Sequence, residues 1–301
     1  MPTSVLSSVE RDFIRSSILS GTRSDGRGPS DYRPPQLVTC LIPQTDGSGR
    51  CRLGDGTDVL VSVKAEVGSV DLATGGDTGR VVCNVEAAPS ANQSFEGRGA
   101  DELNNELTQA LERAISGPQG GLDLKALCIV PGVHCWDIHV DALILDDGGN
   151  LMDALFMATR AALCTSKIPA TTTQDVGEGK VEFEVVDDVD QAKPLAGAKE
   201  VPLCVTVHQI GEGHVVDATP TEALCSSAQI HVSFNRSGQL CALQKGGEGP
   251  IEPSVLMSMI QTGREQAKKL LTWVDQELAR QEQRDEEQRK SGQAPVIQAL
   301  F

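Results

Sequence analysis

The feature that most constrains the fold is a strand, a glycine turn and a helix that follow one another between Val133 and Pro169. Residues 136–145 are mostly apolar, which predicts a largely buried strand. The next residues, 146–150, contain two glycines and predict a turn where positive φ is cheap. Residues 152–164 are rich in Ala, Leu and Met, and predict a helix that ends before Pro169.

Further strands and helices are expected on both sides of this unit. Upstream, apolar runs separated by Gly-rich turns predict strands, and Asp101 can cap a helix with one buried face. Downstream, turn signals predict two hairpins, and Pro253 opens a long helix whose apolar positions reach Val274. The expected strands are 36–42, 51–53, 58–64 and 80–86, and the hairpins cover 202–217 and 228–244.

This pattern predicts an α+β protein with mixed sheets and packed helices, arranged as one domain over residues 1–274. A lead-in helix is expected at 8–20. The segment 171–200 is acidic and punctuated by Pro and Gly, and is interpreted as an insertion loop with one strand at 181–185. Residues 275–301 are interpreted as a charged C-terminal extension, either a solvated helix or a disordered tail.

The charge of the chain limits its partners. The net charge is −16, which argues against a stand-alone RNA-binding module, because neutralising phosphates requires Lys and Arg. The first 100 residues are the least acidic part, with ten basic and twelve acidic residues, and nine of those ten are Arg. Any RNA contact is therefore expected there.

The cysteines and histidines do not form a metal motif. The nine cysteines include no Cys-x-x-Cys pair, and several lie in apolar strands, so buried reduced thiols are expected. No apolar run approaches the roughly 18 residues that span a bilayer, and the N-terminus lacks an apolar signal region. We expect a chain of the cytosol or nucleus, with no bound metal or cofactor.

Several short motifs resemble the RNase PH family in their order and spacing. Arg-x-Asp-Gly-Arg at 23–27 is followed by Arg33-Pro34, and Phe-Glu-Gly-Arg-Gly lies at 95–99. The other matching phrases are 63–66, 134–136, 148–151 and 214–219. The resemblance covers roughly residues 8–274 and implies the RNase PH-like fold, which is ribosomal protein S5 domain 2-like. The most similar branch is that of the eukaryotic exosome ring subunits of the ribosomal RNA-processing protein 42 type.

The resemblance also implies that the family's chemistry is lost here. In active members an Arg-Ser or Arg-Thr pair grips phosphate on the approach to the strand 136–145, but residues 131–135 contain no Arg. Active members also hold a metal ion with an Asp at the position of Asp217 and a second acid six residues on, where this chain has Ala223. Glu222 is not the family's second ligand. We therefore expect no catalytic residue, and interpret Asp217 as a vestigial, structural residue that could cap the turn 219–221.

Three further side chains have two interpretations each. Arg98 is the RNA-contact candidate, because the family's Phe-x-Gly-Arg loop lies near the RNA path, and Gly97 and Gly99 let the backbone approach another chain. Alternatively, Arg98 bonds local carbonyls or a neighbouring subunit's carboxylates. His134 and His139 could act as general bases, but without a nucleophile signature nearby they are interpreted as structural or interface residues.

The resemblance implies a non-catalytic subunit of the RNA exosome ring, supporting 3'-to-5' RNA processing and degradation, including rRNA maturation. The implied partners are other RNase PH-like ring subunits, with the ribosomal RNA-processing protein 41 type as dimer partner, cap proteins, a hydrolytic nuclease and RNA in the channel. No membrane partner is expected, and the implied location is nucleus, nucleolus and cytoplasm. The rival interpretations are an active phosphate-dependent 3'-to-5' exoribonuclease and a stand-alone RNA-binding module.

Overall fold

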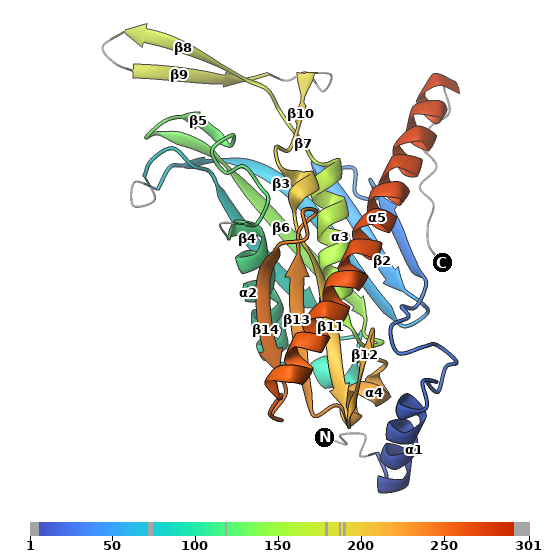
Figure 1. The fold of residues 1–301 in the computed structure, drawn as a ribbon. Coiled ribbons are helices and arrows are strands. Elements are labelled where there is room, and N and C mark those ends of the chain that lie inside the picture. The colour runs from blue at the N-terminus through green and yellow to red at the C-terminus, as the bar shows by residue number, and fades with distance from the viewer. Residues whose placement is uncertain are drawn as a thin grey trace.

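The computed structural model describes residues 6–291 except 72–74, 118, 178–179, 187 and 189–190. After an N-terminal helix, its first half contains a mixed sheet on which two further α-helices pack (Figure 1). The strands are β1 (Pro35–Thr39), β2 (Gly47–Leu53), β3 (Thr57–Ser69), β4 (Arg80–Ala87), β5 (Cys128–Val130) and β6 (His134–Asp146), and the helices are α2 (Asp101–Ser116) and α3 (Leu151–Thr165).

The first sheet has the strand order β1-β2-β3-β6-β4, with β5 paired to β6. All pairs are antiparallel except β4 with β6, which are parallel and are joined through the chain that includes α2. The predicted unit of strand, turn and helix is confirmed as β6, the turn at Gly148 and Gly149, and α3.

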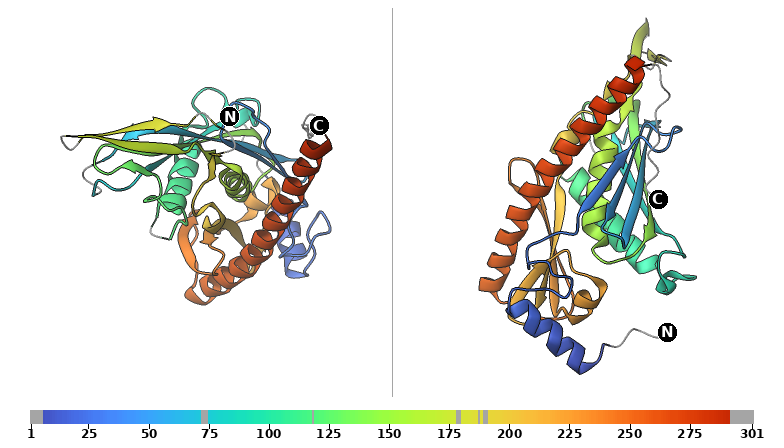
Figure 2. Two further views of the ribbon diagram at one scale, coloured as in Figure 1. Left: turned by 90° about the horizontal axis from the view of Figure 1, so that it is seen from above. Right: turned by 90° about the vertical axis from the view of Figure 1, so that its right-hand side faces the viewer.

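The second half forms an antiparallel sheet in the order β12-β11-β13-β14. Its strands are β11 (Leu203–Ile210), β12 (Gly213–Val216), β13 (Ala228–Phe234) and β14 (Leu240–Gly246), which confirms the two predicted hairpin pairings. The short helix α4 (Pro220–Cys225) links β12 to β13, and the long helix α5 (Pro253–Ser291) runs along much of the molecule (Figure 2).

Helix α3 lies between the two sheets and is buried all round. Every residue from Met152 to Leu163 is buried, and the helix packs on β2 and β3 on one side and on β11 on the other. A helix can be this apolar because both of its faces meet a sheet. Gly49 permits the close approach, since a Cβ there would lie 2.6 Å from the carbonyl oxygen of Ala158. The α+β class with mixed sheets and packed helices is therefore confirmed.

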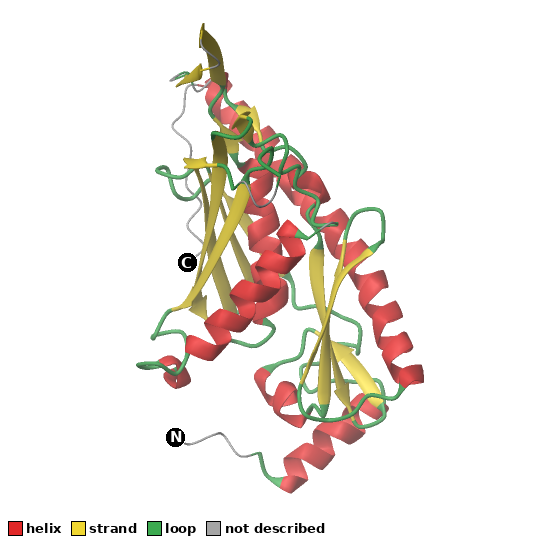
Figure 3. Cartoon of the chain, turned by 90° about the vertical axis from the view of Figure 1, so that its left-hand side faces the viewer, coloured by secondary structure: helices red, strands yellow, loops and turns green. Residues whose placement is uncertain are grey.

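Helix α1 (Ser8–Leu19) forms a separate small core at one end of the molecule (Figure 3). Its capping box joins Ser7 and Glu10, and its buried residues Ile14 and Ile18 pack on residues of β11, β12 and α4. No helix in the described ranges is long and apolar enough to cross a membrane. All nine cysteines are free, and five of them are buried, as the sequence predicted.

The segment 171–200 differs from the loop that we expected. Strand β9 (Lys180–Val185) agrees with the predicted strand, but it pairs with β8 (Thr171–Gly177) in a hairpin that projects beyond the first sheet (Figure 1). The segment also contains β10 (Lys193–Pro194), which pairs with β7 (Lys167–Ile168). The signal for β8 was its run of threonines, which favour extended backbone.

Helix α5 continues past the last predicted apolar position and is neither a free tail nor fully solvated there. The Asp275 carboxylate lies 2.9 Å from the guanidinium of Arg160 on α3. The side-chain amide of Gln281 donates to the Leu37 carbonyl at 2.5 Å and accepts from the Thr39 amide at 3.0 Å. Gln281 therefore satisfies the edge of β1 as a neighbouring strand would. The C-terminal extension is packed on the body at least as far as this residue.

Candidate functional site

The candidate site lies where three distant segments meet around Asp217. Asp217 follows β12 with a left-handed φ of 47°, and Asn150 precedes α3 with a φ of 60°. The third segment is the N-terminal stretch that carries Arg23, Arg27 and Arg33. Asx residues tolerate the left-handed region better than most, so both polar side chains can turn toward these arginines.

The carboxylate of Asp217 is saturated by protein donors. Its Oδ1 accepts from Arg33 Nη2 at 2.7 Å and from Asn150 Nδ2 at 2.9 Å. Its Oδ2 accepts from Arg27 Nη1 and from the Arg33 backbone amide, both at 2.7 Å. Burial acts to raise the pKa of Asp217, but the hydrogen bonds and charge of Arg33 and the bond from Asn150 outweigh it and lower the pKa. The group stays ionised and fully occupied.

A second ion pair lies directly beside it. Arg23 Nη2 is 2.5 Å from Glu222 Oε2, and both side chains are buried. Other donors of Arg23 reach the carbonyls of Val216 and Asp217 at 2.9 and 2.8 Å. Burial acts to raise the pKa of Glu222, but Arg23 and the Thr219 amide outweigh it, so that the pKa is lowered. The arginine motif at 23–27 therefore forms ion pairs with partners about 190 residues away in the chain.

Asp217 does not cap the turn 219–221, contrary to our expectation. Thr219 itself caps α4, and Glu222 completes the capping box by accepting from the Thr219 amide at 2.8 Å. The sequence contained this signal, since Thr219 and Glu222 have the spacing of a capping box. Asp217 instead joins three segments of the chain, which no local pattern could show.

A buried network adjoins this cluster, and the sequence analysis missed it. Asp153 accepts from Tyr32 at 2.6 Å and from Thr206 at 2.7 Å, and Thr206 also contacts His231 Nδ1 at 2.9 Å. Burial raises the pKa of Asp153 to about 6, against hydrogen bonds that act to lower it. Burial lowers the pKa of His231 to about 4, and burial together with His231 lowers that of His208 to about 4. The sequence signal for this network was Asp153, a charged residue within a helix that is otherwise mostly apolar.

The structure separates two places that the sequence analysis had assigned to one lost site. Residues 131–135 include the turn before β6, whereas Asn150 and Asp217 lie near the opposite end of that strand (Figure 1). Thirteen residues of strand separate the two places by roughly 40 Å. The absence of Arg at 131–135 therefore says nothing about the surroundings of Asp217. The relevant residues are 148–151, Gly-Gly-Asn-Leu, which also carry no cation.

The residues present do not fit the metal site of active relatives. Both oxygens of Asp217 are taken by cationic or amide donors, and the position six residues on is Ala223, inside α4. Across the described residues, no group of three or more His, Cys, Asp or Glu side chains could hold a metal ion.

The loop of Arg98 is built around its own contacts. The short helix η2 (Gln93–Phe95) buries Phe95, and Gly97 has a φ of 69°. A Cβ at Gly99 would collide with the carbonyl oxygen of Ser94, so this glycine serves the loop itself and not an approach by another chain. The Arg98 side chain is exposed and has no hydrogen-bond or ion-pair partner in the described part of the chain. Its contact with RNA stays a prediction.

The other candidate residues take structural positions. The rings of His134 and Phe183 lie 4.9 Å apart, which ties β6 to the projecting hairpin. His139 lies 4.0 Å from Glu66 on the adjacent strand. Arg50 and Arg80, also in the first third, pair with Asp58 and Asp137 at 2.6 and 2.5 Å. The number of arginines in the first third had suggested an RNA contact there. Many of these arginines instead form ion pairs with carboxylates of the same chain.

Comparison with known proteins identifies relatives over nearly the whole chain. Residues 31–169 match the model of domain 1 of the 3' exoribonuclease family, and residues 200–266 match domain 2. A Dictyostelium discoideum protein named as the exosome complex exonuclease RRP42 is 33% identical over 318 residues, covering 91% of this chain and 98% of the relative. The exosome complex component Rrp42 of Thermococcus kodakarensis is 36% identical over 256 residues, covering 84% of this chain and 89% of the relative.

A solved structure shows the same fold. A chain of the Archaeoglobus fulgidus exosome with RNA bound to the active site matches with a TM-score of 0.74 and 28% identity. The match covers 87% of this chain and 96% of that one. Because the match covers 87% of this chain, it includes residues of both sheets.

Proposed function

Because this chain belongs to the RNase PH family, in the branch of exosome components named Rrp42, we propose that it is an exosome ring subunit without a catalytic site of its own. The observation that carries the proposal is the saturated carboxylate of Asp217. A metal ion or phosphate would have to displace Arg27, Arg33 or Asn150 from it. Breaking such buried charge pairs costs about 3–5 kcal/mol, which disfavours the enzyme alternative.

The proposed role is to complete the ring and support 3'-to-5' RNA processing and degradation by other components. Its partners would be ring subunits of the same fold, with RNA passing through the assembled channel. The support for this comes from the Thermococcus kodakarensis relative named as an exosome complex component and from the solved exosome that holds RNA. The net charge of −16 is consistent with a subunit that does not bind RNA by itself.

The test is an assay for phosphate-dependent release of nucleoside diphosphates from oligoadenylate. We expect none from the purified chain, with or without Mg²⁺. Asp217→Asn, in a complex that still assembles, should leave the complex's activity unchanged. Asp217→Ala is a poorer test, because it would leave Arg27 and Arg33 without their buried partner. Phosphorolysis by the purified chain that Asp217→Asn abolishes, in a folded protein, would establish the enzyme alternative.

We further propose that Arg98 faces the RNA in the assembled ring. Arg98→Glu should weaken RNA binding for all sequences and reduce its salt dependence by about one unit of slope, because the contact would be to phosphate. The matched control is Arg15→Glu, an exposed arginine on α1. If Arg98→Glu instead removes the subunit from the complex, Arg98 is an interface residue.

A further inference from the structure

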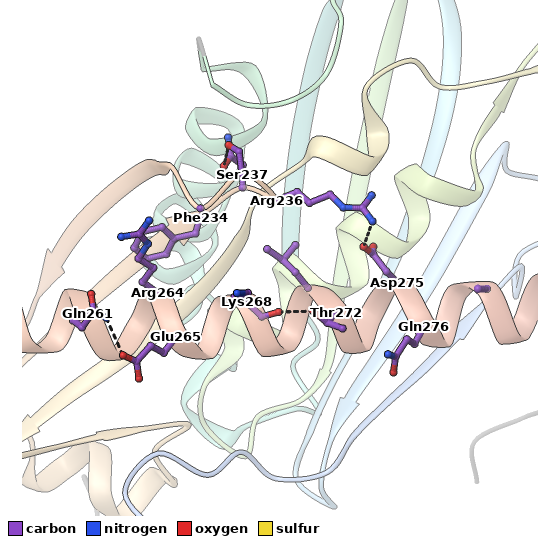
Figure 4. A pocket seen from close by; sticks show the side chains of 14 residues that line it. Phe234, Arg236, Ser237, Gln261, Arg264, Glu265, Lys268, Thr272, Asp275 and Gln276 are labelled. Carbon is purple, nitrogen blue, oxygen red and sulfur yellow. Dashed lines mark hydrogen bonds and ion pairs between the residues drawn. The ribbon is translucent and has the colours of Figure 1, made fainter.

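A groove runs between helix α5 and the turn that joins β13 to β14 (Figure 4). Its volume is about 740 Å³, and it is lined by one face of α5 from Gln261 to Ala279 and by residues 235–238 of the turn. The eighteen helical steps from Gln261 to Ala279 span about 27 Å, which is the length of about eight residues of extended chain. The groove therefore has the proportions of a peptide site rather than of a small-molecule pocket.

Two of the cations that line the groove are exposed. Arg264 and Lys268 are exposed on α5, and neither side chain has a hydrogen-bond or ion-pair partner among the residues that the structure describes. The guanidinium of Arg264 lies beside Gly238, with Nη2 3.5 Å from where a Cβ would be. In Figure 4, Arg264 points from α5 toward the turn, and Arg236 extends from the turn toward Asp275. Binding an anion costs these two side chains little free energy, because no ion pair within the protein must first be broken.

The acidic residues nearby do not neutralise these cations. Asp275 lies 2.9 Å from the buried Arg160 and 3.3 Å from Arg236, so one carboxylate is shared between two guanidiniums. Glu265 also lines the groove, where it accepts a hydrogen bond from Gln261 at 2.8 Å, and its side chain points to the side of α5 away from the turn (Figure 4). The lining holds three cations, Arg236, Arg264 and Lys268, against the two carboxylates Glu265 and Asp275, so the groove keeps an excess of positive charge in a chain whose net charge is −16.

The turn that faces α5 is held rigid by its own hydrogen bonds. The side chain of Asn235 accepts from Ser237 Oγ at 2.7 Å and from the Gln239 amide at 2.9 Å. Gly238 has a φ of 76°, a conformation that glycine adopts at no steric cost. A rigid wall reduces the conformational entropy lost when a ligand is bound.

We propose that this groove binds an acidic segment of a partner protein, with its carboxylates paired to Arg264, Lys268 and Arg236. The inference goes beyond the ring proposal and does not depend on it. RNA fits less well, because Asp275 and the acidic remainder of the chain would repel a continuous line of phosphates. A short protein segment can place its few carboxylates opposite the cations and keep other residues elsewhere.

The test is fluorescence anisotropy on the full chain with a labelled twelve-residue peptide rich in Glu and Leu. Controls are the same peptide with Gln in place of Glu, and a labelled oligoadenylate. We expect the acidic peptide alone to bind, more weakly at 0.5 M than at 0.1 M salt. Lys268→Glu and Arg264→Glu should each lower its affinity at least about fivefold, since each reverses a charge in the site.

The matched control variant is Lys269→Glu, which makes the same charge change one residue along α5, outside the groove lining. It should leave the affinity within about twofold. Equal loss with Lys269→Glu would show binding to overall charge and would overturn the proposal. Binding of the oligoadenylate that Lys268→Glu abolishes would assign the groove to RNA instead. Failure of the acidic peptide to bind would also overturn it, whatever the outcome of the phosphorolysis assay.

Discussion

Two groups of basic residues in this molecule differ in what surrounds them. At Asp217, Arg23, Arg27 and Arg33 donate to carboxylates and carbonyls within the protein. Along α5, Arg264 and Lys268 face solvent without such partners in the described part of the chain. Arg23, Arg27 and Arg33 are therefore structural, while Arg264 and Lys268, which belong to no sequence motif, are available to bind a ligand.

The difference lies in burial as well as pairing. The side chain of Arg23 is fully buried, and that of Arg236 at the groove is 53% exposed. Removing one member of a buried ion pair costs about 3–5 kcal/mol, whereas an exposed pair contributes about 0.2–1 kcal/mol. Substitutions in the two regions should therefore separate stability from binding.

The largest effect is expected from Glu222→Ala, which leaves Arg23 buried without its carboxylate. We expect the free energy of unfolding to fall by about 3–5 kcal/mol, measured by urea denaturation. The matched control is Glu265→Ala at the groove, with a change below about 0.5 kcal/mol. Equal effects of the two substitutions would remove the distinction between the regions.

A smaller effect is expected from pH in the buried network. The pKa of His231 is about 4 in the fold and about 6.5 when unfolded, so the unfolded chain binds a proton that the fold excludes. This stability is complete above pH 6.5 and is lost as pH falls toward 4. Between pH 7 and 5, the wild type should lose about 2 kcal/mol more than His231→Asn, measured by urea denaturation.

Asp153 contributes to the same curve with the opposite sign. Its pKa of about 6 is above its ordinary value, so the folded protein binds this proton more tightly than the unfolded chain does. The contribution of Asp153 to the free energy of unfolding therefore rises as pH falls through 6 toward 4. The comparison of wild type with His231→Asn separates the histidine from this carboxyl. If the free energy of unfolding changed with pH in the same way for the two proteins, His231 would have the same pKa in the folded and unfolded states, which would contradict the prediction.

An effect of about 1–2 kcal/mol is expected from Gln281→Ala, since Leu37 and Thr39 lose the side chain that covers the β1 edge. The control is Gln283→Ala, an exposed residue of the same helix. Truncation after residue 275 should therefore destabilise the body, whereas the sequence pattern indicated a solvated helix or a disordered tail there. Thermal melts of the two substitutions and two truncations, after 275 and after 283, measure this.

The smallest effect on stability is expected where the effect on binding is large. Lys268→Glu and Arg264→Glu should change the free energy of unfolding by less than about 0.5 kcal/mol, because both side chains are exposed and neither has a hydrogen-bond or ion-pair partner among the described residues. Urea denaturation of the variants used in the peptide assay provides the measurement. A loss of several kcal/mol would place these residues in the fold and not in a binding surface.

The sequence by itself determined the elements of the fold. Periodicity, glycine turns and Pro253 located the main strands and helices, including β6, α3 and the start of α5. It also pointed to the family through short motifs, and to the capping box of α4 through the spacing of Thr219 and Glu222. These signals are readable because they depend on neighbours within a few residues of one another.

Tertiary structure decided what the polar residues do. The partners of Asp217 lie up to 190 residues away in the chain, and Gln281 meets a strand more than 240 residues before it. The apolar pattern predicted that α5 packs on the body only as far as its last apolar position, Val274. The contacts of Gln281 with the backbone of β1 leave no signal in the sequence, because a half-buried glutamine and a solvated one are the same residue. The assignment of residues 131–135 to Asp217's site failed for a similar reason, since a thirteen-residue strand separates them. Whether a charge is paired or free depends on which distant segments the packing of two sheets around α3 brings together.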